Sequence, residues 1–198
     1  MSTTRIITDV PQAQVNFVVA LIEADGGTVE RHREASGKVT IVATFADRPA
    51  HSAEMPAEGS AELEWMKFAR EEEGQAEGEA GASNPRIEAY HATTKGGIDR
   101  DSVPWCSSFV NFCVEKAGLQ GTKSKSARSW LRWGVEAPDF VPGCIVVLKR
   151  GSPPQGHVGF YVGQEEGFIR LLGGNQGNQV GIASFDIDRV IGRRVPAP

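Results

Sequence analysis

Cys106 begins the segment of this chain whose residue types and spacing best support covalent chemistry. The apolar residues around it recur in steps of three and four, at Cys106, Phe109, Val110, Cys113, Val114 and Ala117. This spacing predicts one face of a helix that begins just after Pro104 and ends at Gly118. A cysteine in the first turn lies beside unpaired backbone N–H groups, which stabilise a thiolate and can hold an oxyanion. We therefore expect Cys106 to be a reactive, partly exposed thiolate, the alternative being a small core residue like Cys113.

A thiolate nucleophile needs a base and a group that orients the base. His157, one of four histidines, opens a strand-like run and is placed at the rim of the expected sheet. Asn175 follows the next strand-like run, where its side-chain carbonyl could accept the imidazole N–H. The chain order of Cys106, His157 and Asn175 is that of papain-like enzymes, with the nucleophile on a helix and the base on a sheet. Each residue also has a simpler interpretation, because a rim histidine can bind water and turns favour Gly and Asn.

The elements that would position these residues belong to a unit predicted over residues 62–198. Its first half has helical periodicity, at residues 63–73, 105–117 and 126–133. Its second half has the pattern of strands between Gly-rich turns, at residues 144–148, 157–162, 167–172, 180–185 and 190–192. Helices followed by an antiparallel meander of strands indicate an α+β fold. His91 is assigned to a polar loop, and the acidic run over residues 71–79 to a solvated surface.

The first 47 residues have the pattern of a small β-α-β-β module. A strand is expected at residues 5–7, and a helix should carry Val15, Val18, Val19 and Ile22. Two further strands, at residues 28–32 and 38–45, would be joined by a turn at Ser36-Gly37. Residues 48–61 are rich in small residues and proline, so we expect them to be a linker. The role of the module would be targeting or docking, or packing against its neighbour.

Composition limits the classes of protein to which the chain can belong. It has 198 residues, 40% of them apolar, and a formal net charge of −4, so no overall basic field attracts nucleic acid. Three cysteines are too few for a disulfide scaffold and lack the spacing of a zinc site. No stretch reaches the roughly 18 apolar residues of a membrane span, and the N-terminus lacks the apolar core of a signal peptide. We expect a chain that is synthesised in the cytoplasm without a signal peptide.

Four segments resemble the NlpC-like and CHAP-type superfamily of papain-fold cysteine peptidases and amidases. They are residues 101–111 with Pro104-Trp105-Cys106-Ser107, residues 127–134, residues 156–161 with Gly156-His157-Val158-Gly159-Phe160, and residues 173–176. The resemblance covers about residues 63–195. It implies a papain-like α+β fold, with helices packed on an antiparallel sheet, and hydrolysis of amide bonds in bacterial peptidoglycan. It makes Cys106 the nucleophile, His157 the base and Asn175 the third residue, as in CHAP or papain variants.

We therefore predict a peptidoglycan amidase or endopeptidase with a Cys-His-Asn mechanism that needs no metal and no organic cofactor. Substrate binding is expected from Asp101, Trp105, Ser107, Trp130 and Gln176. Asp101 would cap the nucleophile helix or bind a substrate amine. One of the three tryptophans Trp105, Trp130 and Trp133 would line the groove that binds the substrate.

Two other functions are compatible with the sequence. One is a deamidase or transacylase that acts on a protein partner, and the other is a non-catalytic wall-binding or assembly module. For a hydrolase, the expected site of action is the periplasm or cell wall after release or injection, as for an endolysin or an injected antibacterial effector. Its partners would be bacterial peptidoglycan and, for an injected effector, a delivery or immunity protein.

Overall fold

The computed structural model describes residues 3–10, 12, 15, 19, 27–34, 36–45, 63–79 and 82–197. The chain divides into two compact units, one of residues 1–62 with 137–142 and 198, the other of residues 63–136 with 143–197. Each unit has its own antiparallel sheet. The expected linker over residues 48–61 lies outside the described residues. Within the described part, the helices are too short or too polar to span a membrane.

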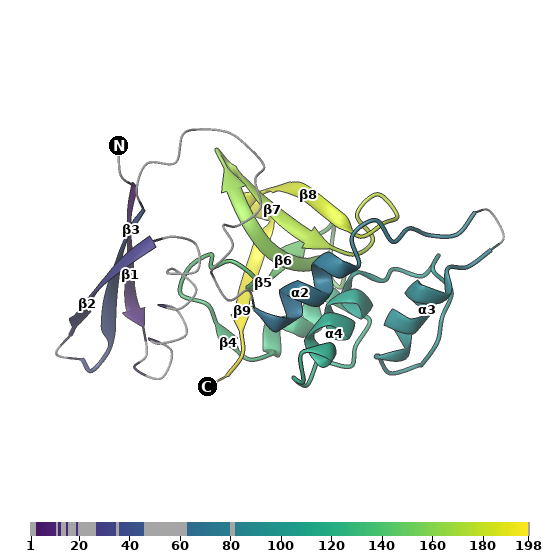
Figure 1. Ribbon diagram of the computed structural model, residues 1–198, viewed down its shortest axis with the longest axis horizontal. Coiled ribbons are helices and arrows are strands. Elements are labelled where there is room, and N and C mark those ends of the chain that lie inside the picture. Colours follow the sequence, from purple (N-terminus) through teal and green to yellow (C-terminus); the bar gives the residue numbers. More distant parts are fainter. Residues whose placement is uncertain are drawn as a thin grey trace. The chain divides into compact units, whose positions relative to one another are not determined.

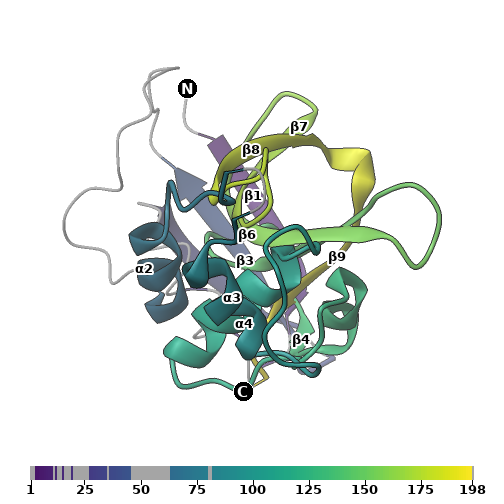
Figure 2. The same cartoon turned by 90° about the vertical axis from the view of Figure 1, so that its right-hand side faces the viewer.

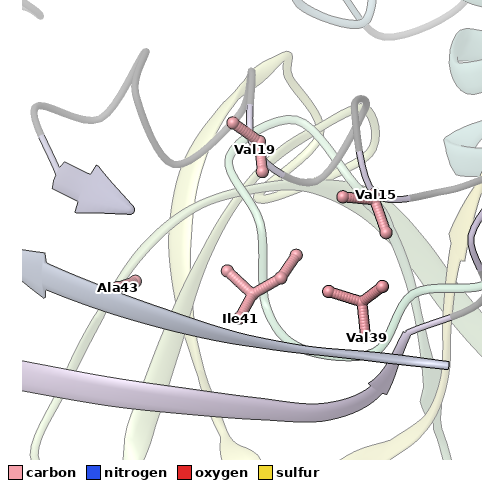
Figure 3. Close-up of a cluster of buried hydrophobic side chains, with 5 residues drawn as sticks. All are labelled: Val15, Val19, Val39, Ile41 and Ala43. Atoms are coloured by element: carbon pink, nitrogen blue, oxygen red, sulfur yellow. The ribbon is translucent and has the colours of Figure 1, made fainter. Parts of the chain in front are cut away.

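The sheet of the first unit has the order β1-β3-β2, with β1 at Thr3–Val10, β2 at Gly27–Arg33 and β3 at Val39–Phe45. The turn between β2 and β3 falls where the sequence predicts it, and Gly37 has the left-handed φ of +80° that favours glycine. Alternate residues of β3 are buried, and they pack with two helical residues spaced four apart (Figure 3), namely Val39, Ile41 and Ala43 with Val15 and Val19. Val18 and Ile22 lie outside the described residues.

The described residues of the second unit form three α-helices, α2 at Glu64–Glu71, α3 at Pro85–Ala92 and α4 at Cys106–Lys116, and two 3₁₀ helices, the first of which is η2 at Ala127–Arg132. The apolar spacing around Cys106 predicted α4 and its end, where Gly118 has a φ of +76°. The assignment of His91 to a polar loop is wrong, because His91 lies in α3 and is buried. The side chain of Asn84 caps α3, and Pro85 occupies its first turn.

The sheet of the second unit has the strand order β4-β9-β5-β6-β7-β8 (Figure 1). Its strands are β4 at Val135–Glu136, β5 at Ile145–Lys149, β6 at Gly156–Glu165, β7 at Phe168–Gly173, β8 at Gly181–Asp186 and β9 at Val190–Val195. The strands from β5 to β8 form the expected meander. The last strand does not continue it, because the short 3₁₀ helix η3 at Ile187–Arg189 leads β9 back to pair with β5. The fold is α+β, as the sequence indicates.

Helix α4 is the central helix of the second unit, and every residue from Cys106 to Val114 is buried. It packs against β6 and β7, with α2 and α3 beside it (Figure 2). The ring of Phe109 on α4 meets Phe160 of β6 edge-on at 6.2 Å between centroids. The ring of Tyr90 on α3 contacts both Phe109 and Phe112 on α4. This packing holds the start of α4 against the strand that carries His157.

Candidate active site

Cys106 is the first residue of α4, and its thiol is buried with 7% of the residue exposed. Trp105, the N-cap residue, makes no side-chain capping bond, so no side chain of that residue competes for the first-turn N–H groups. Burial raises the pKa of the Cys106 thiol, and hydrogen bonds from the backbone of Val158 and Ser107 lower it by less. The expected partly exposed thiolate is therefore corrected to a buried, protonated thiol. The thiol lies beside the peptide bond between His157 and Val158.

His157 is the second residue of β6, buried between neighbouring strands β5 and β7. Burial lowers the pKa of its imidazole to about 4, against the hydrogen bond to Gln176, which raises it. The positive charges of Arg150 and Arg189 lower the pKa further. The imidazole is thus neutral at pH 7. One face of the ring packs against Phe185 of β8, at 5.2 Å between centroids.

Gln176 fixes which nitrogen of the imidazole carries the proton. Its side-chain oxygen Oε1 lies 3.0 Å from Nε2 of His157. Its amide nitrogen donates to the carbonyl of Leu171 at 3.0 Å and to the carbonyl of Gly181. Because both carbonyls can only accept, the amide nitrogen must face them and Oε1 must face the histidine. Nε2 of His157 therefore donates to Oε1, and Nδ1 is the nitrogen with the free lone pair.

The side chain of Asn175 binds Glu77, and the expected Asn175–His157 hydrogen bond is corrected to the one made by Gln176. The backbone of Asn175 is left-handed, with a φ of +58°, and its side-chain amide donates to Oε1 of Glu77 at 2.8 Å. The next residue of the same loop therefore orients the imidazole. Gln176 was expected to bind substrate, but its amide is occupied by His157 and two backbone carbonyls.

The expected substrate contacts of Asp101 and Trp105 are corrected by their burial. Asp101 accepts from the backbone N–H groups of Gly78 at 2.7 Å and Asn84 at 2.9 Å, so it neither caps α4 nor faces a substrate amine. Burial is complete for Trp105, whose indole N–H donates to Glu77 at 3.0 Å. Both side chains secure the segments that lead into α3 and α4.

Ser107 and Trp130 are likewise buried, and they pair with each other rather than with a substrate. The indole N–H of Trp130 donates to Oγ of Ser107 at 2.9 Å, and that hydroxyl donates to the carbonyl of Ser124 at 2.7 Å. This chain of bonds ties α4 to η2. Trp133, the third tryptophan considered for the groove, is half-buried and donates to the carbonyl of Gln120 at 2.7 Å.

Three residues near the site were not singled out by the sequence. Glu77 belongs to the acidic run that was assigned to solvent, yet it accepts two side-chain hydrogen bonds. Arg189 stacks over the ring of Phe185, at 5.2 Å to the centroid. Phe185 alternates with exposed residues along β8, but the sequence of this strand does not show the alternation, because the apolar Ile182 lies on its exposed face. Among the described residues, no group of three or more His, Cys, Asp or Glu side chains could hold a metal ion.

Comparison with known families gives a match, and it includes the candidate nucleophile and the candidate base. Residues 98–175 match the CHAP domain family, and they include both Cys106 and His157. Residues 98–175 of the second unit are therefore similar to a CHAP domain. The match supports a function of the peptidoglycan-hydrolase type.

A solved structure described as similar to a lipoprotein of the NLP/P60 family, from Staphylococcus aureus subsp. aureus Mu50, is also similar to this chain. The two share 18% sequence identity and superpose with a TM-score of 0.41. The alignment covers 69% of this chain and 41% of the other, so the present chain spans about two fifths of its length. A search of curated proteins gives no match.

Proposed function

We propose that the second unit hydrolyses an amide bond of bacterial peptidoglycan with Cys106 as nucleophile, His157 as base and Gln176 as the residue that orients the base. The observation that carries the proposal is the hydrogen bond of 3.0 Å between Gln176 and Nε2 of His157. It leaves the lone pair of Nδ1 as the proton acceptor of the neutral ring. The contact between the Cys106 thiol and the backbone of Val158 supports the placement of the sulfur beside that ring.

The first step moves a proton and forms a bond. Nδ1 of His157 takes the proton from the thiol as the sulfur attacks the amide carbonyl carbon. Because burial keeps both partners uncharged at rest, proton transfer accompanies attack rather than preceding it. Backbone N–H groups at the start of α4 hold the oxyanion of the tetrahedral intermediate.

The second step releases the amine and regenerates the thiol. The imidazolium of His157 gives its proton to the leaving nitrogen as the C–N bond breaks, which leaves a thioester on Cys106. Water then gives a proton to Nδ1 and adds its hydroxide to the thioester carbonyl. The carboxylic acid leaves, and the proton returns to the sulfur. Gln176 keeps the ring in one orientation through both transfers.

Purified sacculi test the proposal directly. The wild-type protein should release soluble fragments, each cleavage adding one water and exposing one amine and one carboxyl group, as read by mass spectrometry. Cys106→Ala and His157→Ala should release none, whereas Cys113→Ala, which removes a buried thiol on the same helix, should remain active. The new termini distinguish an amidase, which cuts between sugar and peptide, from an endopeptidase. Intact sacculi after prolonged incubation with the wild type would overturn the proposal and leave action on a protein amide as the function to test.

A further inference from the structure

One carboxylate oxygen of Glu77 binds both the residue before the nucleophile Cys106 and the residue before Gln176. Oε1 of Glu77 accepts a hydrogen bond from the indole nitrogen of Trp105 at 3.0 Å. The same oxygen accepts from the amide nitrogen of Asn175 at 2.8 Å. Trp105 precedes the nucleophile Cys106, and Asn175 precedes Gln176, so Glu77 lies between the start of α4 and the loop after β7.

The position of Glu77 is itself fixed from two sides. Its backbone N–H donates to the carbonyl of Asn178 at 2.9 Å, within the loop that also carries Asn175. The neighbouring N–H of Gly78 donates to the buried carboxylate of Asp101 at 2.7 Å, on the segment that leads into α4. The backbone at Glu77 is therefore held in place by bonds that do not involve its carboxylate, which is left to accept from Trp105 and Asn175.

The loop after β7 also rests directly on the start of α4. A Cβ atom placed on Gly174 would lie 2.5 Å from Cζ3 of Trp105 and 2.7 Å from Cβ of Phe109, so only glycine fits against the indole. The next residue, Asn175, adopts a φ of +58°, which turns its amide toward Glu77. The contact of Gly174 with Trp105 and Phe109 sets the distance between the loop and α4. The hydrogen bonds to Glu77 fix the orientation of the loop relative to that helix.

We propose that Glu77 is a positioning residue, which aligns the loop that carries Gln176 with the helix that carries Cys106 and thereby sets the geometry between His157 and the thiol. This inference rests on the proposed function. A carboxylate suits the task because it only accepts hydrogen bonds, and charge-assisted bonds to two N–H donors are stronger than neutral ones. Asn175 thus contributes through Glu77, not through the imidazole.

The test uses the full-length chain with Glu77→Ala, Glu77→Gln and the control Glu79→Ala, which removes an exposed carboxylate two residues away. Glu77→Ala should lower kcat on soluble wall fragments by about tenfold or more, with KM nearly unchanged, because the effect is on alignment and not on binding. Glu77→Gln retains an oxygen acceptor and should recover most of kcat. The control should match the wild type. Wild-type kcat in Glu77→Ala would overturn the proposal.

A double-mutant cycle separates positioning from a general effect on the fold. If Glu77 acts through Gln176, Glu77→Ala should cost little in a Gln176→Ala background, where the imidazole is no longer oriented. Equal fractional losses in both backgrounds would overturn the proposal. If Glu77→Ala does not fold, Trp105→Phe and Asn175→Gly test the two hydrogen bonds separately. The first keeps an aromatic ring and the second keeps the left-handed backbone, and each should lower kcat, whereas wild-type values in both would overturn it.

The alkylation rate of Cys106 distinguishes failure of this inference from failure of the proposed function. Iodoacetamide needs no wall substrate, so the rate reports the thiol and its base even if the protein leaves sacculi intact. Glu77→Ala should change this rate severalfold at fixed pH, with Glu77→Gln and Glu79→Ala close to the wild type. An unchanged rate would overturn the positioning role, whatever the activity on sacculi.

Discussion

Oε1 of Gln176 lies 3.0 Å from Nε2 of His157, and the amide nitrogen of Gln176 is held by the backbone carbonyls of Leu171 and Gly181. The imidazole is thereby fixed in one tautomer by backbone groups of β7 and β8. A short loop between two strands thus provides the orienting group of the candidate site, and its effect on chemistry is measurable.

Replacing Gln176 with alanine should lower kcat by about 10- to 100-fold, because the imidazole loses its orienting acceptor. Steady-state rates on a soluble wall fragment measure the change. The matched control is Gln179→Ala, an exposed glutamine of the same loop whose backbone carbonyl accepts from Gln176. The control should stay within about twofold of the wild type. Equal rates for Gln176→Ala and the wild type would contradict the orienting role.

The pH dependence of Cys106 alkylation should show a neutral resting pair. Burial raises the pKa of the thiol and lowers the pKa of His157 to about 4, so thiol and imidazole are the forms present at pH 7. The rate of reaction with iodoacetamide should therefore keep rising from pH 6 to above pH 9. A pre-formed thiolate–imidazolium pair would instead give a rate plateau across the neutral range, and such a plateau would refute the neutral pair.

Much of the fold follows from local patterns in the sequence. The steps of three and four from Cys106 define α4, and the alternating or continuous apolar runs define strands β5 to β8, within a few residues. The pairing of β9 with β5 is not visible in this way, because strand order depends on long-range contacts. Helix α3 was missed although Asn84 and Pro85 form a start signal, since its apolar face is short.

The candidate site could be predicted only where local sequence patterns determine the position of a residue. Cys106 and His157 are recognisable from the helix start and the strand start on which they lie. The choice between Asn175 and Gln176 depends on the path of a loop in which Asn175 has a left-handed φ of +58°, so that Asn175 binds Glu77 and Gln176 binds His157. The burial of Trp105 and Asp101 depends on partners that are 28 and 23 residues away, namely Glu77 and Gly78.

Cys113→Ala should show that Cys113 contributes to stability and not to catalysis. Cys113 is fully buried on α4, and burial raises the pKa of its thiol well above the usual value. The substitution should lower the free energy of unfolding by about 1–2 kcal/mol and leave hydrolysis intact. Urea unfolding and mass-spectrometric mapping of alkylated peptides provide the measurements. Faster alkylation of Cys113 than of Cys106 in the native protein would contradict both assignments.

Stability should fall as the pH falls below about 6.5, the ordinary pKa of histidine in an unfolded chain. His157 has its pKa lowered to about 4, and burial and the charge of Lys125 lower the pKa of His91. Between pH 6.5 and 4 the unfolded chain therefore binds more protons than the folded chain. His157 alone should lower the free energy of unfolding by about 3 kcal/mol across this range. Urea unfolding at pH 7.5, 6, 5 and 4 checks the trend.

Two variants test the source of that pH dependence. His157→Gln should weaken it, whereas substitution of the exposed His32 to Gln should leave it unchanged. A urea midpoint that stays constant down to pH 5 would show that the imidazole of His157 accepts a proton readily in the folded protein. The neutral resting pair would then have to be abandoned as well.

The unit formed by β1, β2 and β3 should be dispensable for the chemistry. Its described residues include no cysteine, and its strand β2 carries Arg31, His32 and Arg33, all exposed. Such a surface suits docking to a partner or to the wall polymer. A chain shortened to begin near Ser60 should therefore fold, cleave soluble wall fragments at the wild-type rate and act more weakly on intact cells. The full-length Arg31→Ala, Arg33→Ala double variant should reproduce the loss on intact cells without a change on fragments. If the shortened chain has a native circular dichroism spectrum yet leaves soluble fragments intact, the first unit takes part in substrate binding, and docking is not its role.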